Sequence, residues 1–430
     1  STAADSAETV VQFTDEAVSV SGSGCEADGT ALTISESGVY RLSGSCADGS
    51  VKVKKGTTGV TLILDGLTLA SADTAPITCG KSSQVTIEAA AGTLNALSDS
   101  EQNNDDTYPA NEDAENAVLK CKDGSQVTLC GTGALTLTAN GKNGIKSGAS
   151  TDEDGEASLT VRELTLTISA PVNDAINVGQ LLTIESGDLT ISAADDAIHC
   201  DYTLQIGAEG TDGPAISITD CYEGLEAAAL TVASGDIRIR ASDDCLNAAN
   251  SDLFGFDFSM DISGGTIDAY TASGDSFDSN GSMTISGGTI CVWTANTADN
   301  QPLDADGTIT ITGGTVLAAG GSAGMGMKLS VTQPYVTFGQ SGGMQMRGAD
   351  ALIAAGSTLA ISDGTDTLFS MEAPCGARFV FFSAPELAEG ESYTLLSDGE
   401  SAGTADAQTG ESQSGFGGMP GGRPGGFEPS

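Results

Sequence analysis

The feature that most constrains the fold of this chain is a short internal repeat. Runs such as Met260–Ile262 and Met283–Ile285 are each followed by a Ser-Gly-Gly turn and by a second run that begins with Thr. Apolar and polar residues alternate within each run, which is the periodicity of a β-strand and not of a helix. The repeat therefore predicts a chain made of many short, similar strands.

A second motif, centred on one apolar residue that we call the anchor, recurs between the paired runs. The anchors are Ile176, Ile198, Leu225, Leu246, Phe277 and Leu303. Successive anchors are 21 to 31 residues apart. A repeat of this length with three short strands is typical of one coil of a parallel β-helix, whereas a propeller blade needs about 40 residues. A leucine-rich repeat has a similar period but requires helical segments, which the short Ala-rich stretches of this chain do not favour.

The sequence thus predicts an all-β fold, a right-handed single-stranded parallel β-helix with a cap at each end. We place a β-rich N-terminal cap at 1–56, the parallel β-helix at 57–334 and a small C-terminal β cap at 335–397. Caps are expected because an open end would expose unpaired strand edges. Residues 398–430 are rich in Gly, Ser and Pro, which predicts a flexible tail.

The charge of the chain argues against several classes of partner. Asp and Glu number 59 against 16 Lys and Arg, which gives a net charge of −43. Such a surface repels nucleic acid and anionic lipid, and it attracts metal cations. The sequence contains no apolar run long enough to span a bilayer, so we expect no membrane insertion.

Acidic residues recur at fixed positions around the anchors, and stacked coils would align them. The first column, two residues before the anchor, contains Asp174, Asp196, Glu223, Asp244 and Asp275. The second column, one residue after the anchor, contains Asn177, His199, Glu226, Asn247, Asp278 and Asp304. Members of the first column are directly preceded by Asn173, Asp195 and Asp243. We call these residues together the acidic ladder.

Stacking would bring neighbouring carboxylates of the ladder about 5 Å apart, the spacing of adjacent strands. At an effective dielectric constant of about 20, two unit charges at this distance repel by about 3 kcal/mol. Crowded carboxylates take up protons or bind cations. We predict that the Asn, Asp and Glu residues of the ladder bind several Ca2+ ions, because calcium takes roughly six to eight oxygen ligands. Solvated Asp residues that merely fill turns are the alternative. Zinc and iron fit poorly because His199 is the only histidine.

The ten cysteines include no C-x-x-C pair, so disulfide bonds in an exported protein are the preferred interpretation. Cys79 and Cys121 precede matching strands and are expected to stack in adjacent coils, and Cys25 with Cys46 would close the cap. Cys200 with Cys221 is a further possible pair, and free stacked thiols are the alternative. The N-terminus shows no basic or apolar segment, so we expect a signal peptide to be absent or already removed.

The series N-D-A-I-N (173–177), D-D-A-I-H (195–199), Y-E-G-L-E (222–226) and D-D-C-L-N (243–247), together with the I-S-G-G-T-I turns, carries a family resemblance. The chain resembles the bacterial extracellular carbohydrate-binding domain family of calcium-binding parallel β-helix proteins, which have a pectate-lyase-like fold. The resemblance implies a secreted or cell-surface bacterial protein that holds calcium in its ladder. It also implies binding of an acidic polysaccharide such as polygalacturonate or pectin.

We expect a binding protein rather than an enzyme. The residues expected to contact polysaccharide are Tyr222, Lys146, Arg238 and Arg240. Calcium held by the ladder would join the acidic chain to the acidic polymer. Trp293 lies in an apolar run and is expected to be structural.

Two other functions stay open at this point. A calcium-dependent polysaccharide lyase would use a Lys or Arg side chain, such as Lys142 or Lys146, to remove the proton next to a uronate carboxylate. A structural subunit of a surface layer or filament would oligomerise through its C-terminal tail, with residues 411–430 docked on the next subunit.

Overall fold

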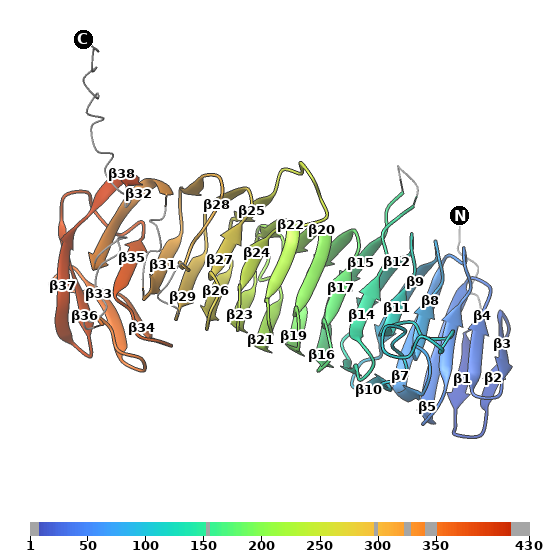
Figure 1. The fold of residues 1–430 in the computed structure, drawn as a ribbon. Helices are drawn as coiled ribbons and strands as arrows, with labels where there is room; N and C mark the ends of the chain where they lie inside the picture. The colour runs from blue at the N-terminus through green and yellow to red at the C-terminus, as the bar shows by residue number, and fades with distance from the viewer. Residues whose placement is uncertain (1–7, 152–154, 296–299, 322–327, 340–350, 414–430) are drawn as a thin grey trace, which may run out of the picture.

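The computed structural model describes residues 8–151, 155–295, 300–321, 328–339 and 351–413. All the regular elements in these ranges are strands, and 34 of them belong to one large, mostly parallel sheet (Figure 1). The described residues contain no helix long and apolar enough to cross a membrane. The predicted all-β class is therefore confirmed.

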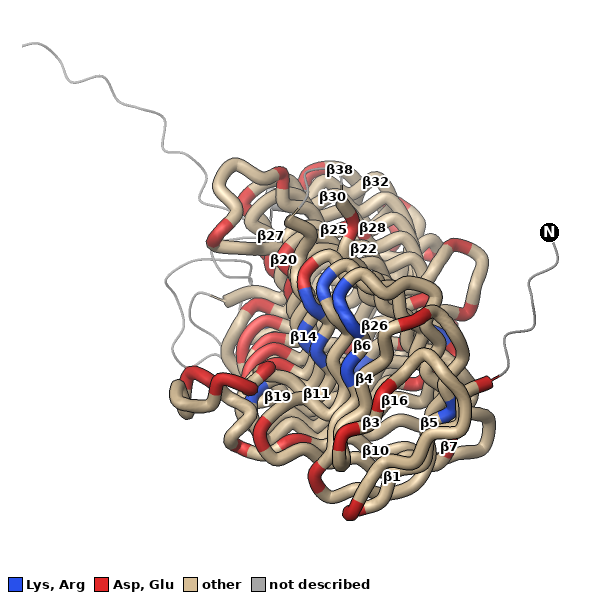
Figure 2. The backbone as a smooth tube through the Cα atoms, turned by 90° about the vertical axis from the view of Figure 1, so that its right-hand side faces the viewer, with Lys and Arg blue, Asp and Glu red and all other residues tan. Residues whose placement is uncertain are grey.

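The large sheet consists of three stacks of parallel strands, because each strand pairs with the strand about three places later in the chain. In the ladder stack, β14 (Asn143–Ser147) pairs with β17 (Ile176–Val178), which pairs with the first part of β20 (Ile198–Ile206). The chain thus passes through three strands and returns beside the first, and we call this unit a coil. Seen from the N-terminal end, the coils lie one behind another (Figure 2). Right-handed winding as a single-stranded β-helix stays a prediction.

The remaining strands of the three stacks follow the same order. The ladder stack also contains β4 (Ala31–Ile34), β6 (Ser50–Val53), β8 (Ile77–Cys79), β11 (Ala117–Cys121), β22 (Leu225–Val232), β24 (Leu246–Ala248) and β27 (Phe277–Ser279). The second stack contains β9 (Gln84–Ala89), β12 (Gln126–Cys130), β15 (Ser158–Val161), β18 (Leu181–Ile184), the last parts of β20 and β22, β25 (Ser259–Ile262), β28 (Ser282–Ile285), β30 (Ile309–Ile311) and β32 (Lys328–Gly339). The third stack contains β7 (Val60–Ser71), β10 (Leu94–Asp99), β13 (Ala134–Thr138), β16 (Leu164–Ala170), β19 (Gly187–Ala193), β21 (Ala215–Asp220), β23 (Asp236–Ala241), β26 (Thr266–Thr271), β29 (Thr289–Thr294) and β31 (Thr315–Gly320).

The core runs through the centre of the stacked coils and is filled by the inward side chains. Ile145, Ile176, Ile198 and Leu225 stand in register on successive strands, and none is exposed to solvent. No single coil can bury these side chains, since each packs against the coils on both sides. The predicted anchors are therefore core residues, and they fix which residues of each motif face outward.

The first coils begin earlier than the predicted boundary at residue 57. β1 (Thr9–Phe13) pairs antiparallel with β2 (Val18–Ser21), and β3 (Cys25–Asp28) pairs antiparallel with β4. However, β1 is also parallel to β5 (Gly38–Cys46), which continues the parallel stacking to β7. The antiparallel strands thus cover the N-terminal end of the stack, and the parallel coils already begin within the predicted cap.

The C-terminal end is closed by antiparallel strands, which corrects the predicted tail. β35 (Phe379–Ser383) pairs antiparallel with β31 and β32. A separate sheet contains β33 (Thr358–Ser362), β34 (Thr367–Glu372), β36 (Ser392–Ser397) and β37 (Glu400–Asp406). β38 (Gln408–Gln413) pairs with β32. The prediction of a flexible tail from residue 398 was wrong up to residue 413, because backbone pairing orders this polar segment. Residues 414–430 lie outside the described residues.

All ten cysteines are free thiols, so the prediction of disulfide bonds is not supported. Cys79 and Cys121 do stand in register on β8 and β11, as expected, but no disulfide joins them. The proposed partners Cys200 and Cys221 contact backbone carbonyls instead, since the Cys200 thiol donates to the carbonyl of Thr203 at 3.2 Å. The remaining proposed pair, Cys25 with Cys46, stands opposite other residues in the sheet.

The stacked anchors predict a large cost for removing one of them. Ile198→Ala should lower the free energy of unfolding by about 2–5 kcal/mol, because it leaves a cavity between Ile176 and Leu225. Ile198→Val should cost only about 0.5–1.5 kcal/mol. Urea denaturation measures both, with Leu94→Ala as a control because the Leu94 side chain is 80% exposed. An Ile198→Ala variant as stable as the Leu94→Ala control would contradict the continuous core.

Candidate functional site

The second column of the ladder lies on consecutive strands of the ladder stack. Asn177 stands beside His199, His199 beside Glu226, and Glu226 beside Asn247. Asn247 stands beside Asp278 in turn. The bridge between the anchors Phe277 and Leu303 places Asp304 at the next position. The structure therefore brings the second column together as a single file on one face of the molecule.

The first column lies in the turns that lead into these strands, where backbone amides link one coil to the next. The amide of Asp196 donates to Oδ1 of Asp174 at 3.3 Å, and the amide of Asp275 donates to Oδ1 of Asp244 at 2.7 Å. The amide of Gln301 donates in the same way to Asp275. Each of these carboxylates thus caps the backbone of the following coil, which fixes its position in the column.

Burial and mutual repulsion raise the pKa of the ladder carboxyl groups. Burial, followed by the neighbouring charges of the ladder, raises the pKa of Asp196 to about 6, of Glu223 to about 7 and of Asp244 to about 8. The same causes raise the pKa of Asp275 to about 7 and of Asp278 to about 6. Carboxyl groups in this state favour any partner that supplies positive charge.

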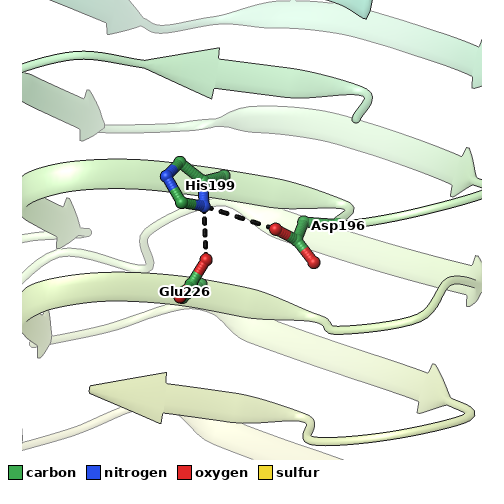
Figure 3. A group of neighbouring side chains, drawn as sticks. All are labelled: Asp196, His199 and Glu226. Atoms are coloured by element: carbon green, nitrogen blue, oxygen red, sulfur yellow. Dashed lines mark hydrogen bonds and ion pairs between the residues drawn. The ribbon is translucent and has the colours of Figure 1, made fainter. Parts of the chain in front are cut away.

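His199 supplies positive charge at one position of the ladder (Figure 3). Its Nδ1 contacts Asp196 at 3.3 Å and Glu226, and its Nε2 contacts Asp201 at 3.0 Å. Burial alone would lower the pKa of His199, but hydrogen bonds to these three carboxylates raise it to about 12. The imidazolium therefore offsets part of the negative charge of this cluster. Asp201 was not among the predicted site residues, although its position two residues after His199 on one strand places both on the same face.

Two other clusters each bring three carboxylates together, although the first of them shares Asp196 with the His199 cluster. Asp174, Asp195 and Asp196 form one, and Asp275, Asp278 and Asp304 form the other. In each cluster one oxygen from every residue lies within 4.8 Å of the others. These are the positions at which predicted ligands converge closely enough to share an ion.

Two buried amide oxygens in the ladder lack a hydrogen-bond donor. One is Oδ1 of Asn247, whose Nδ2 donates to Glu223 at 3.0 Å, and the other is Oε1 of Gln301. Sequence reasoning missed Gln301, although it lies two residues before the anchor Leu303 and so occupies the first column. An uncompensated oxygen among carboxylates suits a hard cation, which supplies the positive partner that the protein lacks there.

Other predicted ligands have different partners. Nδ2 of Asn177 donates to Asp174 at 2.7 Å, and Nδ2 of Asn173 donates to Asn143 at 2.8 Å. Asp243 accepts a hydrogen bond from the hydroxyl of Tyr222, which raises the pKa of Tyr222 to about 12. The Tyr222 ring itself is 47% exposed at the edge of the ladder.

The predicted cationic contacts divide into two groups. Arg238 and Arg240 both point towards Asp268 of the next coil, at 3.7 Å and 2.7 Å. Lys142 pairs with Asp106. Lys146 stands beside Asn177 at the N-terminal end of the second column, and it has no ion-pair partner among the described residues. Of the predicted cations, Lys146 is thus the one available to a ligand at the ladder.

Exposed aromatic rings lie next to the ladder and were not predicted. Phe254 is fully exposed, and Tyr202 is 40% exposed with its ring 6.3 Å from that of Phe256. The loop carrying Phe254 and Phe256 is tied to the ladder strand because Nδ2 of Asn250 donates to the carbonyl of Asp201 at 2.9 Å. The sequence signal for this aromatic surface was the alternation of Phe254, Phe256 and Phe258 in an otherwise polar loop. Trp293, in contrast, is fully buried, as predicted.

The chain is similar to part of one curated protein and to one solved structure. A protein of Acetivibrio thermocellus described as a carbohydrate-binding domain-containing protein is 34% identical over 119 residues, covering 26% of this chain and 39% of the relative. A solved structure described as the polysaccharide lyase-like protein from C. thermocellum, gadolinium derivative, aligns at 21% identity with a TM-score of 0.38. The alignment covers 76% of this chain and 94% of that one.

The family model described as carbohydrate-binding domain-containing protein matches residues 28–324. This match includes most of the coils and the whole acidic ladder. Because it spans more than half of the sequence, the chain belongs to the carbohydrate-binding domain-containing protein family.

Proposed function

We propose that this chain is a secreted, right-handed parallel β-helix protein that binds an acidic polysaccharide of the polygalacturonate type through calcium held by the acidic ladder. The observation that carries the proposal is the file of partly buried carboxyl groups with raised pKa values and two uncompensated amide oxygens. Calcium would supply positive charge and open coordination positions for uronate carboxylates.

The residues present fit calcium best at one of the three clusters. Asp275, Asp278 and Asp304 have no cationic side chain among them, and Gln301 adds an amide oxygen in the adjacent position. Asp174, Asp195 and Asp196 form a weaker candidate, because Asp196 also contacts Nδ1 of His199 at 3.3 Å. The cluster around His199 already contains a cation, so we expect calcium to be excluded there.

The aromatic residues at the ladder's edge complete the proposed polysaccharide surface. Sugar rings pack their C–H faces on aromatic side chains, and Tyr222 is exposed directly beside Asp243. Tyr202 follows the anchor of its strand, Ile198, whereas Tyr222 precedes the paired anchor Leu225, so the two rings flank the ladder on opposite sides. Phe254 lies in the loop whose Phe256 ring packs near that of Tyr202. A polymer crossing the ladder would therefore meet both charge and aromatic surface.

Calcium should stabilise the protein in a way that depends on the ladder. At a calcium concentration about 100 times the dissociation constant, one site adds about 2.7 kcal/mol to the free energy of unfolding, so Tm rises. Asp275→Asn should reduce this rise. Asp261→Asn, which changes an exposed carboxylate on β25, should not. An equal calcium effect in both variants, measured by thermal denaturation after metal stripping, would refute the assignment of Asp275.

Polygalacturonate binding should be strengthened by calcium, and the Asp275→Asn/Asp278→Asn double variant should lose that increment. Isothermal titration with and without excess EDTA measures this increment.

Tyr222→Ala should weaken polygalacturonate binding about tenfold, equivalent to about 1.4 kcal/mol, if a sugar stacks on the ring. Formation of unsaturated uronate product during the titration, lost in Lys146→Gln, would instead assign the chain as a lyase.

The metal-free protein should become less stable as the pH rises from 5 to 8. Ladder carboxyl groups have a higher pKa in the folded than in the unfolded chain, so their stabilising contribution is complete at low pH and is lost as the pH rises through about 6 to 8. Each such group contributes a slope of up to about 1.4 kcal/mol per pH unit. Asp244→Asn should flatten the upper part of this slope in EDTA. Metal-free stability that increases over this range would contradict the raised pKa values.

A further inference from the structure

The few positive charges of this acidic chain are concentrated in one part of it. Eight of the nine lysines fall between residues 52 and 146, within the first coils. Figure 2 shows blue segments gathered on one side of the stack, beside the labels of β6 and β14. These strands belong to the ladder stack, so the lysines and the acidic ladder share one face.

Strand register aligns the lysines as it aligns the acids. Lys52 on β6 stands beside Thr78, which stands beside Lys120 on β11, and Lys120 stands beside Lys146 on β14. Lys146 then stands beside Asn177. The second column of the ladder is therefore continued towards the N-terminus by a column of ammonium groups. Along this continuous column the side-chain charge changes from positive at Lys146 to negative at the carboxylates of the ladder.

Further lysines flank this column. Lys54 and Lys122 come two residues after Lys52 and Lys120, on the same outward side of their strands. An open pocket of about 290 Å³ lies here, and its charged lining consists of Lys81, Lys120 and Lys122 together with Asp105, Glu115 and Asp123. We call Lys52, Lys54, Lys81, Lys120, Lys122 and Lys146 the lysine patch.

The patch has more positive charge than its own carboxylates neutralise. Lys122 pairs with Glu115 at 2.6 Å, and Lys81 pairs with Asp123 at 2.6 Å. In the described ranges no carboxylate pairs with Lys52, Lys54, Lys120 or Lys146. Burial, together with the like charges of Lys146 and Lys122, lowers the pKa of Lys120. An anionic ligand would relieve this repulsion.

We propose that the lysine patch binds carboxylates of an acidic polysaccharide directly, without a metal ion. The inference rests on the proposed function and adds a second, metal-independent section to the same surface. A single extended uronate polymer lying along the stack would contact ammonium groups on β6 to β14 and then the calcium-bearing ladder. Nucleic acid is the less favoured polyanion, because the ladder next to the patch repels phosphate over the rest of that face.

The test is binding of polygalacturonate in excess EDTA at low ionic strength. The Lys52→Gln/Lys120→Gln/Lys146→Gln variant should bind about tenfold more weakly than the native chain, and added salt should weaken the native binding. Lys120→Arg should retain binding. Arg162→Gln removes an exposed positive charge outside the ladder stack and is the control for Lys120→Gln. Lys120→Gln should weaken polygalacturonate binding, whereas Arg162→Gln should leave it unchanged.

The outcomes separate this inference from the proposed function. Calcium-dependent binding with none in EDTA would overturn the patch alone, whereas no binding in either condition would overturn both. Equal affinity for fully methyl-esterified pectin would exclude carboxylate recognition. Equal affinity for single-stranded DNA or dextran sulfate would make the patch a general polyanion surface and overturn the assignment. Dissociation of a dimer by the triple variant, with unchanged polymer binding, would assign the patch to a second copy of the chain and also overturn it.

Discussion

The register between parallel strands determines nearly everything else in this structure. Each coil lies on the previous one with its anchor directly over the preceding anchor, so a residue type repeated at one offset becomes a column in space. On the inside this alignment produces a dry core of Ile, Leu and Val. On the outside it places charges of the same sign next to each other, where they repel unless something neutralises them.

The protein relieves this repulsion by several means along one face. Backbone amides of the following coil donate to Asp174, Asp244 and Asp275. His199 provides an internal cation between Asp196 and Glu226. Carboxyl groups such as Asp244 retain protons to higher pH than usual. These contacts leave some negative charge uncompensated. It remains at the cluster of Asp275, Asp278 and Asp304 and at the amide oxygens of Asn247 and Gln301, where an added cation would have the largest effect.

Sequence reasoning succeeded where a property repeats and failed where it depends on a single local contact. The anchors and most members of both columns followed from spacing alone, and the second-column neighbours from Asn177 to Asp278 stand in strand register. The disulfide prediction is not supported: Cys79 and Cys121 stack in register but remain free thiols, and Cys25 and Cys46 stand opposite other residues. Arg238 and Arg240 seemed available for a ligand, but Asp268 on the next coil holds both. The aromatic loop around Phe254 was overlooked because it interrupts the repeat.

The sequence by itself determined the all-β class, the length of each coil, the residues that face inward and the alignment of acids on one face, because these depend only on periodicity. Only the tertiary structure decided that the column of lysines continues into the second column of the acidic ladder. The lysines at 52, 120 and 146 are separated by unequal intervals and are not a motif in the chain. They become one column with the ladder only because insertions of different length bring β6, β8, β11 and β14 into the same stack.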